Sequence, residues 1–274
     1  MLKRFALSEI TFERVSGHLL RRLAYLDSWK NWHTSEVGRF NQLALEAYRN
    51  KHSGERAIII CNGPSLKKTD MKLVQNETSF CMNRSYLMFE DWGFTPTYFS
   101  LTNELVLQQF AQDIRALPMP KFTDFAYRDL LKPQHGTTYF RLPPRLADKF
   151  EGDLRNPISS GGTVTFATLQ IAYCLGFRDV IIIGMDHRFK AQGVPSAAEI
   201  RKNAVDEDHA HPNYFPKGMK WELPDLIRSE LAYRQAREKY EMAGRRIIDA
   251  TVDGACTVFE KMTLEDALRV TAKS

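Results

Sequence analysis

The chain has 274 residues and an ordinary globular composition, with 43% hydrophobic and 26% charged residues. It is long enough to bury a substantial core, either as one large α/β domain with an appendage or as two small domains. The net charge of +5 is modest, and no block of Arg and Lys alternates with aromatic residues. Phosphate-bearing small molecules or an anionic membrane surface suit this charge, and we expect no nucleic-acid partner.

The four cysteines stand singly in apolar segments, without the CxxC spacing of a metal or redox site. We therefore expect reduced, buried thiols rather than a disulfide framework or a zinc site. The sequence also shows no signal peptide and no uninterrupted apolar run of about 18 residues, so a cytoplasmic protein is expected.

Residues 1–52 are predicted to form a helical extension ahead of the main domain, residues 53–274. Apolar residues recur at helical spacing in Ser16–Trp32, and a second helix is predicted over Thr34–Asn50. In one interpretation these helices pack on the main domain or join two copies of the chain as a homo-oligomer. In the other, the first helix, with Trp29 and several basic residues, lies on the inner surface of a membrane.

Short apolar segments alternate with helical ones in the remainder of the chain. The segments predicted as strands are Ala57–Cys61, Thr78–Asn83, Tyr98–Thr102, Lys121–Thr123, Thr138–Leu142, Val180–Ile183 and Arg246–Thr251. Helices are predicted over Thr163–Leu175 and Pro224–Ala243. This order predicts an α/β fold with a doubly wound, mostly parallel Rossmann-like sheet. The polar stretch Lys190–Lys220 has a disordered composition, and such a segment inside a compact domain is often a lid or binding loop.

Three predicted strands end in amide or hydroxyl side chains, namely Asn62 and Ser65, Asn83, and Asn103. Gly63, beside the first of them, permits a close approach of the backbone. Because parallel strands end at the same edge of a sheet, where α/β proteins bind nucleotides, we expect these residues to gather into a nucleotide-binding wall. The alternative is that each residue only shapes a local turn.

The loop Ser159–Thr163 leads directly into an apolar helix. Its members Ser159, Ser160, Gly161 and Thr163 offer hydroxyls and free N–H groups at a helix N-terminus, which suits phosphate. Simple capping of the helix is the alternative. The loop is not a Walker A motif, and the chain lacks a GxGxxG fingerprint, which counts against a P-loop kinase or a dinucleotide oxidoreductase.

Titratable side chains occur at two further places. Asp186 follows the most hydrophobic predicted strand, where a carboxylate suits a sugar hydroxyl or a magnesium ion, although it could equally cap the turn. In the polar stretch, His209 and His211 are candidates for a general base. Asp206 and Asp208 have the spacing to bind a divalent ion that bridges phosphates, and a solvated charge run is the alternative.

Several segments together resemble the Maf/MptE-like family, which includes bacterial motility accessory factors that glycosylate flagellin and an archaeal 6-hydroxymethylpterin diphosphokinase. The matching parts are CNGPSL at 61–66, the strand end at Asn83, SSGGTVTFATLQIAYCLGF at 159–177, IIIGMDHRF at 181–189 and HAHPNYFPKG at 209–218. The resemblance spans residues 56–251 and leaves the helical extension outside. More distantly, the pattern is similar to bacterial sialyltransferases that use CMP-sialic acid.

The distant resemblance implies roles for individual residues. Asn62, Gly63 and Asn83 would contact the nucleotide, and Ser160 and Gly161 the CMP portion. A histidine of the later segment, His211 or His209, would deprotonate the acceptor hydroxyl. The sialyltransferases carry phosphate-binding tyrosines after the Gly-x-Asp strand, which this chain lacks. The phosphate ligands would then come from His187, Arg188, Tyr214 or Lys217.

Three functions follow as expectations. The favoured one is a glycosyltransferase that moves a sugar, for example a nonulosonic acid, from a CMP-type nucleotide donor to a carbohydrate or protein hydroxyl, with no cofactor required. The first alternative is a magnesium-dependent transferase that resembles 6-hydroxymethylpterin diphosphokinase and uses ATP. The second alternative is a non-catalytic nucleotide-binding or assembly domain.

Overall fold

A computed structural model of the chain describes residues 25–143, 147–190, 193, 195–196, 198–201 and 206–271. Its centre is an eight-stranded sheet in the order β10-β9-β6-β1-β2-β3-β4-β5, in which every pairing is parallel. The strands are β1 (Arg56–Ile60), β2 (Ser79–Met82), β3 (Tyr98–Ser100), β4 (Lys121–Asp124), β5 (Thr137–Phe140), β6 (Asp179–Ile183), β9 (Arg246–Asp249) and β10 (Glu260–Lys261). The predicted parallel α/β sheet is confirmed.

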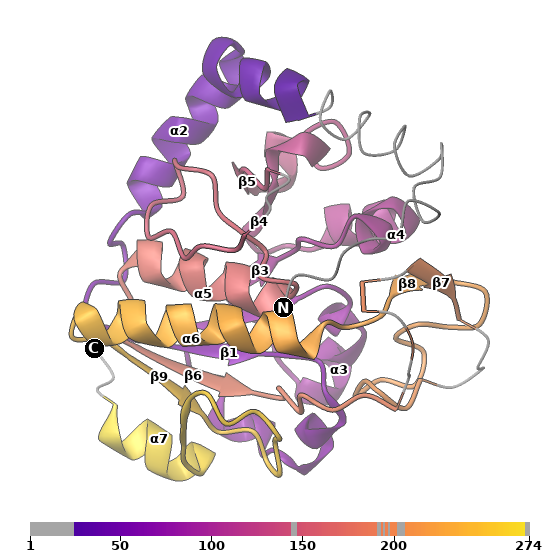
Figure 1. Cartoon of the computed structure of the whole chain (residues 1–274), viewed down its shortest axis with the longest axis vertical. Helices are drawn as coiled ribbons and strands as arrows, with labels where there is room; N and C mark the ends of the chain where they lie inside the picture. Colours follow the sequence, from indigo (N-terminus) through magenta and orange to yellow (C-terminus); the bar gives the residue numbers. More distant parts are fainter. Residues whose placement is uncertain are drawn as a thin grey trace, which may run out of the picture.

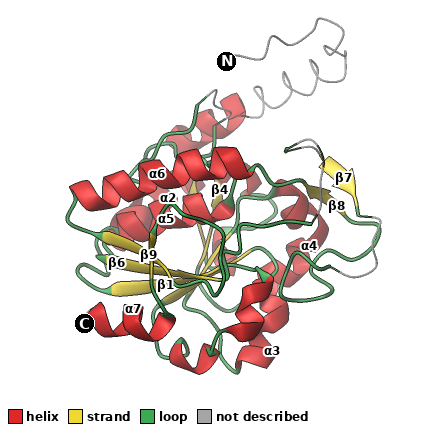
Figure 2. Ribbon diagram, turned by 60° about the horizontal axis from the view of Figure 1, so that its bottom comes forward, coloured by secondary structure: helices red, strands yellow, loops and turns green. Residues whose placement is uncertain are grey.

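Helices cover both faces of this sheet (Figures 1 and 2). One face carries α2 (Glu36–Tyr48), α5 (Val164–Leu175) and α6 (Leu226–Met242), and the other carries α3 (Phe89–Trp92), α4 (Glu104–Ala116) and α7 (Leu264–Val270). Side chains of β1 alternate between the two layers, since Ile59 packs with the α5 side and Ile58 with the α7 side. Burial on both faces explains why β1 is an unbroken apolar run.

The loops that follow β1 and β6 leave the sheet toward opposite faces. After β1 the chain enters a 3₁₀ helix, Pro64–Lys68, whose Leu66 packs in the core on the α7 side. After β6 the chain passes through the 187–224 segment to α6, on the opposite face. Because β1 and β6 are neighbours, their diverging loops open a crevice at the carboxyl edge of the sheet, where open α/β folds bind ligands.

Helix α2 protects the edge of the sheet. The side-chain amide of Asn41 donates to the carbonyl oxygen of Tyr139 at 2.8 Å and accepts from the N–H of Tyr139 at 2.6 Å. It thereby occupies the backbone groups that edge strand β5 would otherwise offer to another chain. The predicted helix over Thr34–Asn50 is confirmed; residues 25–34 are also helical, whereas the rest of the predicted helix Ser16–Trp32 lies outside the described residues.

The prediction of disorder for Lys190–Lys220 is wrong for its described residues. They include strand β7 (Ala198–Ile200), which pairs with β8 (Lys220–Glu222) in a separate antiparallel hairpin. Tyr214 and Phe215 are buried against the sheet in the core cluster that contains α4. We call residues 206–224 the lid, since they cover the crevice. Among the helices that the structure describes, none has the length and apolarity to cross a bilayer.

Candidate active site

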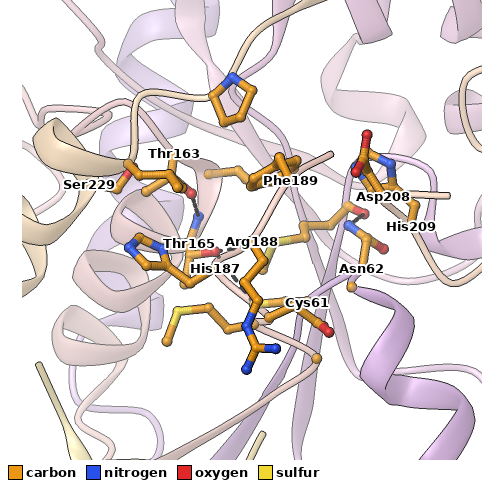
Figure 3. A pocket seen from close by; sticks show the side chains of 18 of the residues that line it. Cys61, Asn62, Thr163, Thr165, His187, Arg188, Phe189, Asp208, His209 and Ser229 are labelled. Atoms are coloured by element: carbon orange, nitrogen blue, oxygen red, sulfur yellow. Dashed lines mark hydrogen bonds between the residues drawn. The ribbon is translucent and has the colours of Figure 1, made fainter. Parts of the chain in front are cut away.

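A cavity of about 170 Å³ lies at the crevice between the ends of β1 and β6 (Figure 3). Thr163 and Ser229 lie on one side of it, and Asn62, Asp208 and His209 lie on the other, with Phe189 between them. A second cavity of about 370 Å³ adjoins the first, and the two share lining residues, among them Asn83, Phe189 and His209. The edge predicted to bind a nucleotide is therefore hollow and continuous with a larger space beneath the lid.

The corner after β1 is fastened to the corner after β6. The backbone N–H of Gly63 donates to the carbonyl oxygen of Gly184 at 2.8 Å, and the Ser65 hydroxyl donates to the Asp186 carboxylate at 2.7 Å. A Cβ atom on Gly63 would overlap with that carboxylate, so the predicted close approach is real. Asp186 lines the first cavity, but its oxygens already hold the Ser65 corner in place.

Two asparagines that line the first cavity each have a buried amide oxygen without a partner among the described residues. The amide of Asn62 donates to the carbonyl oxygen of Met82 at 3.2 Å, which fixes its orientation and leaves its Oδ1 buried and unbonded among the described residues. Oδ1 of Asn83 is likewise buried without a hydrogen bond there, on a residue with a left-handed backbone (φ 53°). A buried acceptor without a partner costs about 1–3 kcal/mol, so each oxygen is poised for a ligand donor.

Some residues of the Ser159–Thr163 loop hold it in place, and others line a cavity. The Ser159 hydroxyl donates to the Asp148 carboxylate, and Gly161 is wedged between α5 and α6. Thr163 caps α5, because its hydroxyl oxygen accepts from the N–H of Thr165. Thr163 and Ser160 also line the second cavity, together with Val164, the first residue of α5. Ser159 and Gly161 are therefore supports, whereas Ser160 and Thr163 face the ligand space.

The lid carries one histidine into the cavities. His209 lines both, and its Nδ1 lies 2.9 Å from Oδ2 of Asp206. Its ring stacks on Tyr214 with 4.0 Å between ring centroids. His211, by contrast, lines a separate cavity of about 500 Å³ beside Lys67, and not either of the first two. The structure thus separates the two candidate bases, and of the two it brings only His209 to the cavities at the end of β1.

The remaining predicted residues are scattered. His187 lines the first cavity and its Nε2 lies 3.1 Å from Glu230, whereas the Arg188 side chain lines the same cavity from an exposed position. Asn103 lines the second cavity and caps α4 through its Oδ1. Lys217 is exposed and lines neither cavity.

Comparison with known proteins places the chain in a family. A family model described as 6-hydroxymethylpterin diphosphokinase MptE-like matches residues 32–192, more than half of the chain. The chain belongs to the MptE-like family. This confirms the family expected from the sequence.

The solved structure of a Maf glycosyltransferase from Magnetospirillum magneticum AMB-1 is similar to this MptE-like chain, with a TM-score of 0.52 and 14% sequence identity. The similarity covers 86% of this chain and 40% of that one, so this chain spans less than half of the length of its structural neighbour. At this identity the likeness shows a shared fold. No curated protein matches the chain.

The two carboxylates predicted as magnesium ligands in this MptE-like chain already have partners. Asp206 accepts from the Arg201 guanidinium and from the N–H groups of Asp208 and Phe215, besides its contact with His209. Asp208 accepts from the N–H of Lys190 at 2.7 Å and lies 3.7 Å from the Arg201 guanidinium. No other cluster of three acidic, His or Cys side chains suits a metal in the described part of the chain. These residues do not fit a magnesium ion, and we derive no step through one.

Sequence reasoning missed the residues that hold the lid. The Arg84 guanidinium donates to the carbonyl oxygens of Asn213 and Tyr214, and the N–H of Ala210 donates to the carbonyl oxygen of Asn62 at 2.8 Å. Arg84 follows Asn83 directly, but an Arg at a strand end gives no sign of the distant carbonyl groups that it binds.

Burial raises the pKa of the Cys61 thiol to about 12, so this cavity-lining cysteine is protonated at neutral pH.

Proposed function

We propose that this protein is a glycosyltransferase that uses a CMP-type nucleotide-sugar donor, with the nucleoside in the first cavity and the acceptor in the second. The observation that carries the proposal is the pair of amide oxygens on Asn62 and Asn83 that are unbonded among the described residues, beside a histidine that lines both cavities. Amide oxygens accept hydrogen bonds, so they suit the exocyclic amine of a cytosine or the hydroxyls of a ribose. They do not suit phosphate oxygens, which are themselves acceptors.

The phosphate of the donor would lie at the N-terminus of α5. Gly162, Thr163 and Val164 line both cavities there, and the helix dipole favours negative charge at that end. Arg188 also lines the first cavity, but its guanidinium donates to the carbonyl oxygen of Asp253, so it would have to leave that partner to reach the phosphate. Of the predicted phosphate ligands, Lys217 lines neither cavity, and the Tyr214 hydroxyl accepts from the N–H of Arg84 at 3.4 Å.

The chemistry is a base-assisted displacement. The acceptor hydroxyl oxygen forms a bond to the anomeric carbon of the sugar while the bond from that carbon to the phosphate oxygen breaks. CMP leaves with the bonding electron pair, and the hydroxyl proton passes to His209. The second cavity suits a hydroxyl-bearing acceptor, either a carbohydrate or a protein side chain, because Asn103, Ser160 and Arg228 supply polar groups along its wall.

Calorimetric titration with CMP, CDP, UDP and ATP in the presence of EDTA tests the donor class. We expect CMP to bind, and Asn62→Ala to weaken CMP binding about tenfold, the equivalent of one hydrogen bond. Asn76→Ala replaces an exposed Asn outside both cavities and should bind CMP as the wild type does. The proposal fails if CDP, UDP and ATP bind and CMP does not.

A second candidate is favoured by the description of the matched family, namely a diphosphokinase that passes pyrophosphate from ATP to a hydroxymethylpterin with magnesium. The bonded state of Asp206 and Asp208 argues against it, because magnesium would have to displace an arginine and several N–H groups. In the same titration, ATP binding that appears only when magnesium replaces EDTA would favour this candidate.

A further inference from the structure

The carboxylate of Asp206 is the organising group of the lid. Its side chain has no exposed surface, and it receives hydrogen bonds from Arg201 at 3.2 Å, from two backbone N–H groups and from the His209 ring. Burial alone would raise the pKa of this carboxyl group, but the hydrogen bond from His209, the charge of Arg201 and the hydrogen bond from the N–H of Asp208 bring that pKa below its usual value. Asp206 is therefore ionised at neutral pH.

An ionised carboxylate accepts hydrogen bonds and donates none, so the nitrogen that faces it must carry the proton. In His209 this nitrogen is Nδ1, 2.9 Å from Oδ2 of Asp206. The Nε2 atom has no hydrogen-bond partner among the described residues, and the ring lines both cavities. A neutral His209 thus presents the lone pair of Nε2 to whatever occupies the cavities.

The orientation of the ring is fixed from several sides. Tyr214 stacks on it at an interplanar angle of 9°, and Phe215 meets it edge-on at 5.2 Å between ring centroids. The next residue, Ala210, is bonded through its N–H to the carbonyl oxygen of Asn62 in the nucleotide wall. A shift of the loop at Asn62 would therefore move the backbone next to His209 and change the position of its ring.

We propose that Asp206 is a positioning residue, which holds His209 as the Nδ1–H tautomer and aims Nε2 at the acceptor hydroxyl. This inference rests on the proposed function. During transfer, Nε2 takes the hydroxyl proton as the new bond to the anomeric carbon forms, and the resulting imidazolium donates from Nδ1 to a carboxylate that is already in place. Pre-placed charge of this kind needs no reorganisation as the reaction proceeds.

A purely structural role for Asp206 is the competing explanation, since Arg201 and the N–H groups of Asp208 and Phe215 would still need an acceptor. Both roles place a proton on Nδ1 of His209 in the wild type, so they differ in the turnover of a folded Asp206→Asn variant. A structural anchor leaves kcat unchanged in that variant, whereas the positioning role requires kcat to fall as the ring shifts toward Nε2–H.

The test is a long-range ¹H–¹⁵N spectrum of the full chain labelled at histidine, with His209→Asn used to assign the signal. We expect the wild-type ring to be the Nδ1–H tautomer. Asp206→Asn, which offers an N–H donor in place of an acceptor, should shift the ring toward Nε2–H, and Glu207→Gln, at an exposed lid carboxylate, should leave it unchanged. Turnover with a CMP-sugar should fall in Asp206→Asn by about 100-fold or more in kcat, with little change in the KM for the donor.

A wild-type ring in the Nε2–H form overturns the inference even if Asp206→Asn does not fold. An unchanged kcat in a folded Asp206→Asn variant overturns it as well. If the tautomers are as expected but His209→Asn turns over a CMP-sugar at the wild-type rate, His209 is not the base and its pairing with Asp206 is only structural, while the proposed function stands. The proposed function fails if the wild type itself turns over no CMP-sugar.

Discussion

Replacing His209 with Asn should lower the rate of sugar transfer about 10²–10⁴-fold, the usual contribution of a positioned general base. Asn keeps an N–H group that can reach the Asp206 carboxylate, so the lid retains most of its hydrogen bonds, but it has no counterpart of Nε2. The loss should appear in kcat, because the Asn62 and Asn83 side chains that would bind the nucleotide are untouched. Initial rates with a CMP-sugar and an excess of acceptor measure the effect.

His211→Asn is the matched control. His211 lies two residues away on the same lid, and its Nδ1 accepts from the N–H of Asn213 at 3.1 Å, while its ring lines the separate cavity beside Lys67. We expect it to transfer sugar close to the wild-type rate. The reverse result, with His211→Asn inactive and His209→Asn active, would mean that the reaction occurs on the other side of the β1 corner.

Gly63→Ala should abolish nucleotide binding and destabilise the fold by about 1–3 kcal/mol, the usual cost of forcing a methyl group into a packed site. The new Cβ would overlap with the carboxylate of Asp186 and lie 2.6 Å from the carbonyl oxygen of Gly184. Because the second contact is with backbone, the ends of β1 and β6 must separate. Thermal unfolding and a CMP titration on the same sample measure both effects.

Ser65→Ala separates the steric effect from the loss of a hydrogen bond at this corner. It removes the 2.7 Å bond from the Ser65 hydroxyl to Asp186 and adds no atom, so we expect a cost of only about 1 kcal/mol and measurable CMP binding. Gly63→Ala that binds CMP as tightly as Ser65→Ala would show that the close approach of the two corners has no part in forming the site.

The sheet could be predicted because its central strands carry an unambiguous signal. The runs that became β1 and β6 are apolar on both faces, as parallel strands between two helical layers must be. Helix α4 and the C-terminal pair β10 and α7 were not predicted. Helix α4 has buried apolar residues at helical spacing, Val106, Leu107 and Ile114, and was overlooked despite that pattern, whereas β10 has two residues and gives no pattern.

The lid was misjudged because its polar residues satisfy one another. Arg201 pairs with Asp206 and lies over the Trp221 ring, 4.8 Å from its centroid, so a segment that is polar in composition buries a packed network. Composition reports the residue types and not their partners. For the same reason the sequence could not show whether His209 or His211 is the candidate base. The cavity that each ring lines depends on the irregular path of the lid.

The gathering of Asn62, Asn83 and Asn103 at one edge could be predicted, because parallel strands fix the side on which their ends meet. Which residues of the Ser159–Thr163 loop support it and which line the cavity could not be predicted, since this depends on how closely α6 packs against Gly161. In the proposed function, residues 61–63 of RAIIICNGPSL (residues 56–66) face the nucleoside, and the phosphate lies at the start of α5.

The most direct test of this account is a crystal structure of the full chain with a CMP-sugar analogue that cannot be transferred. The account predicts that the cytidine donates hydrogen bonds to the amide oxygens of Asn62 and Asn83, that the phosphate lies at the start of α5, and that the anomeric carbon faces the cavity shared with His209. A nucleotide bound beside His211 and Lys67 instead, or with its phosphate against the Asn62 and Asn83 oxygens, would contradict it.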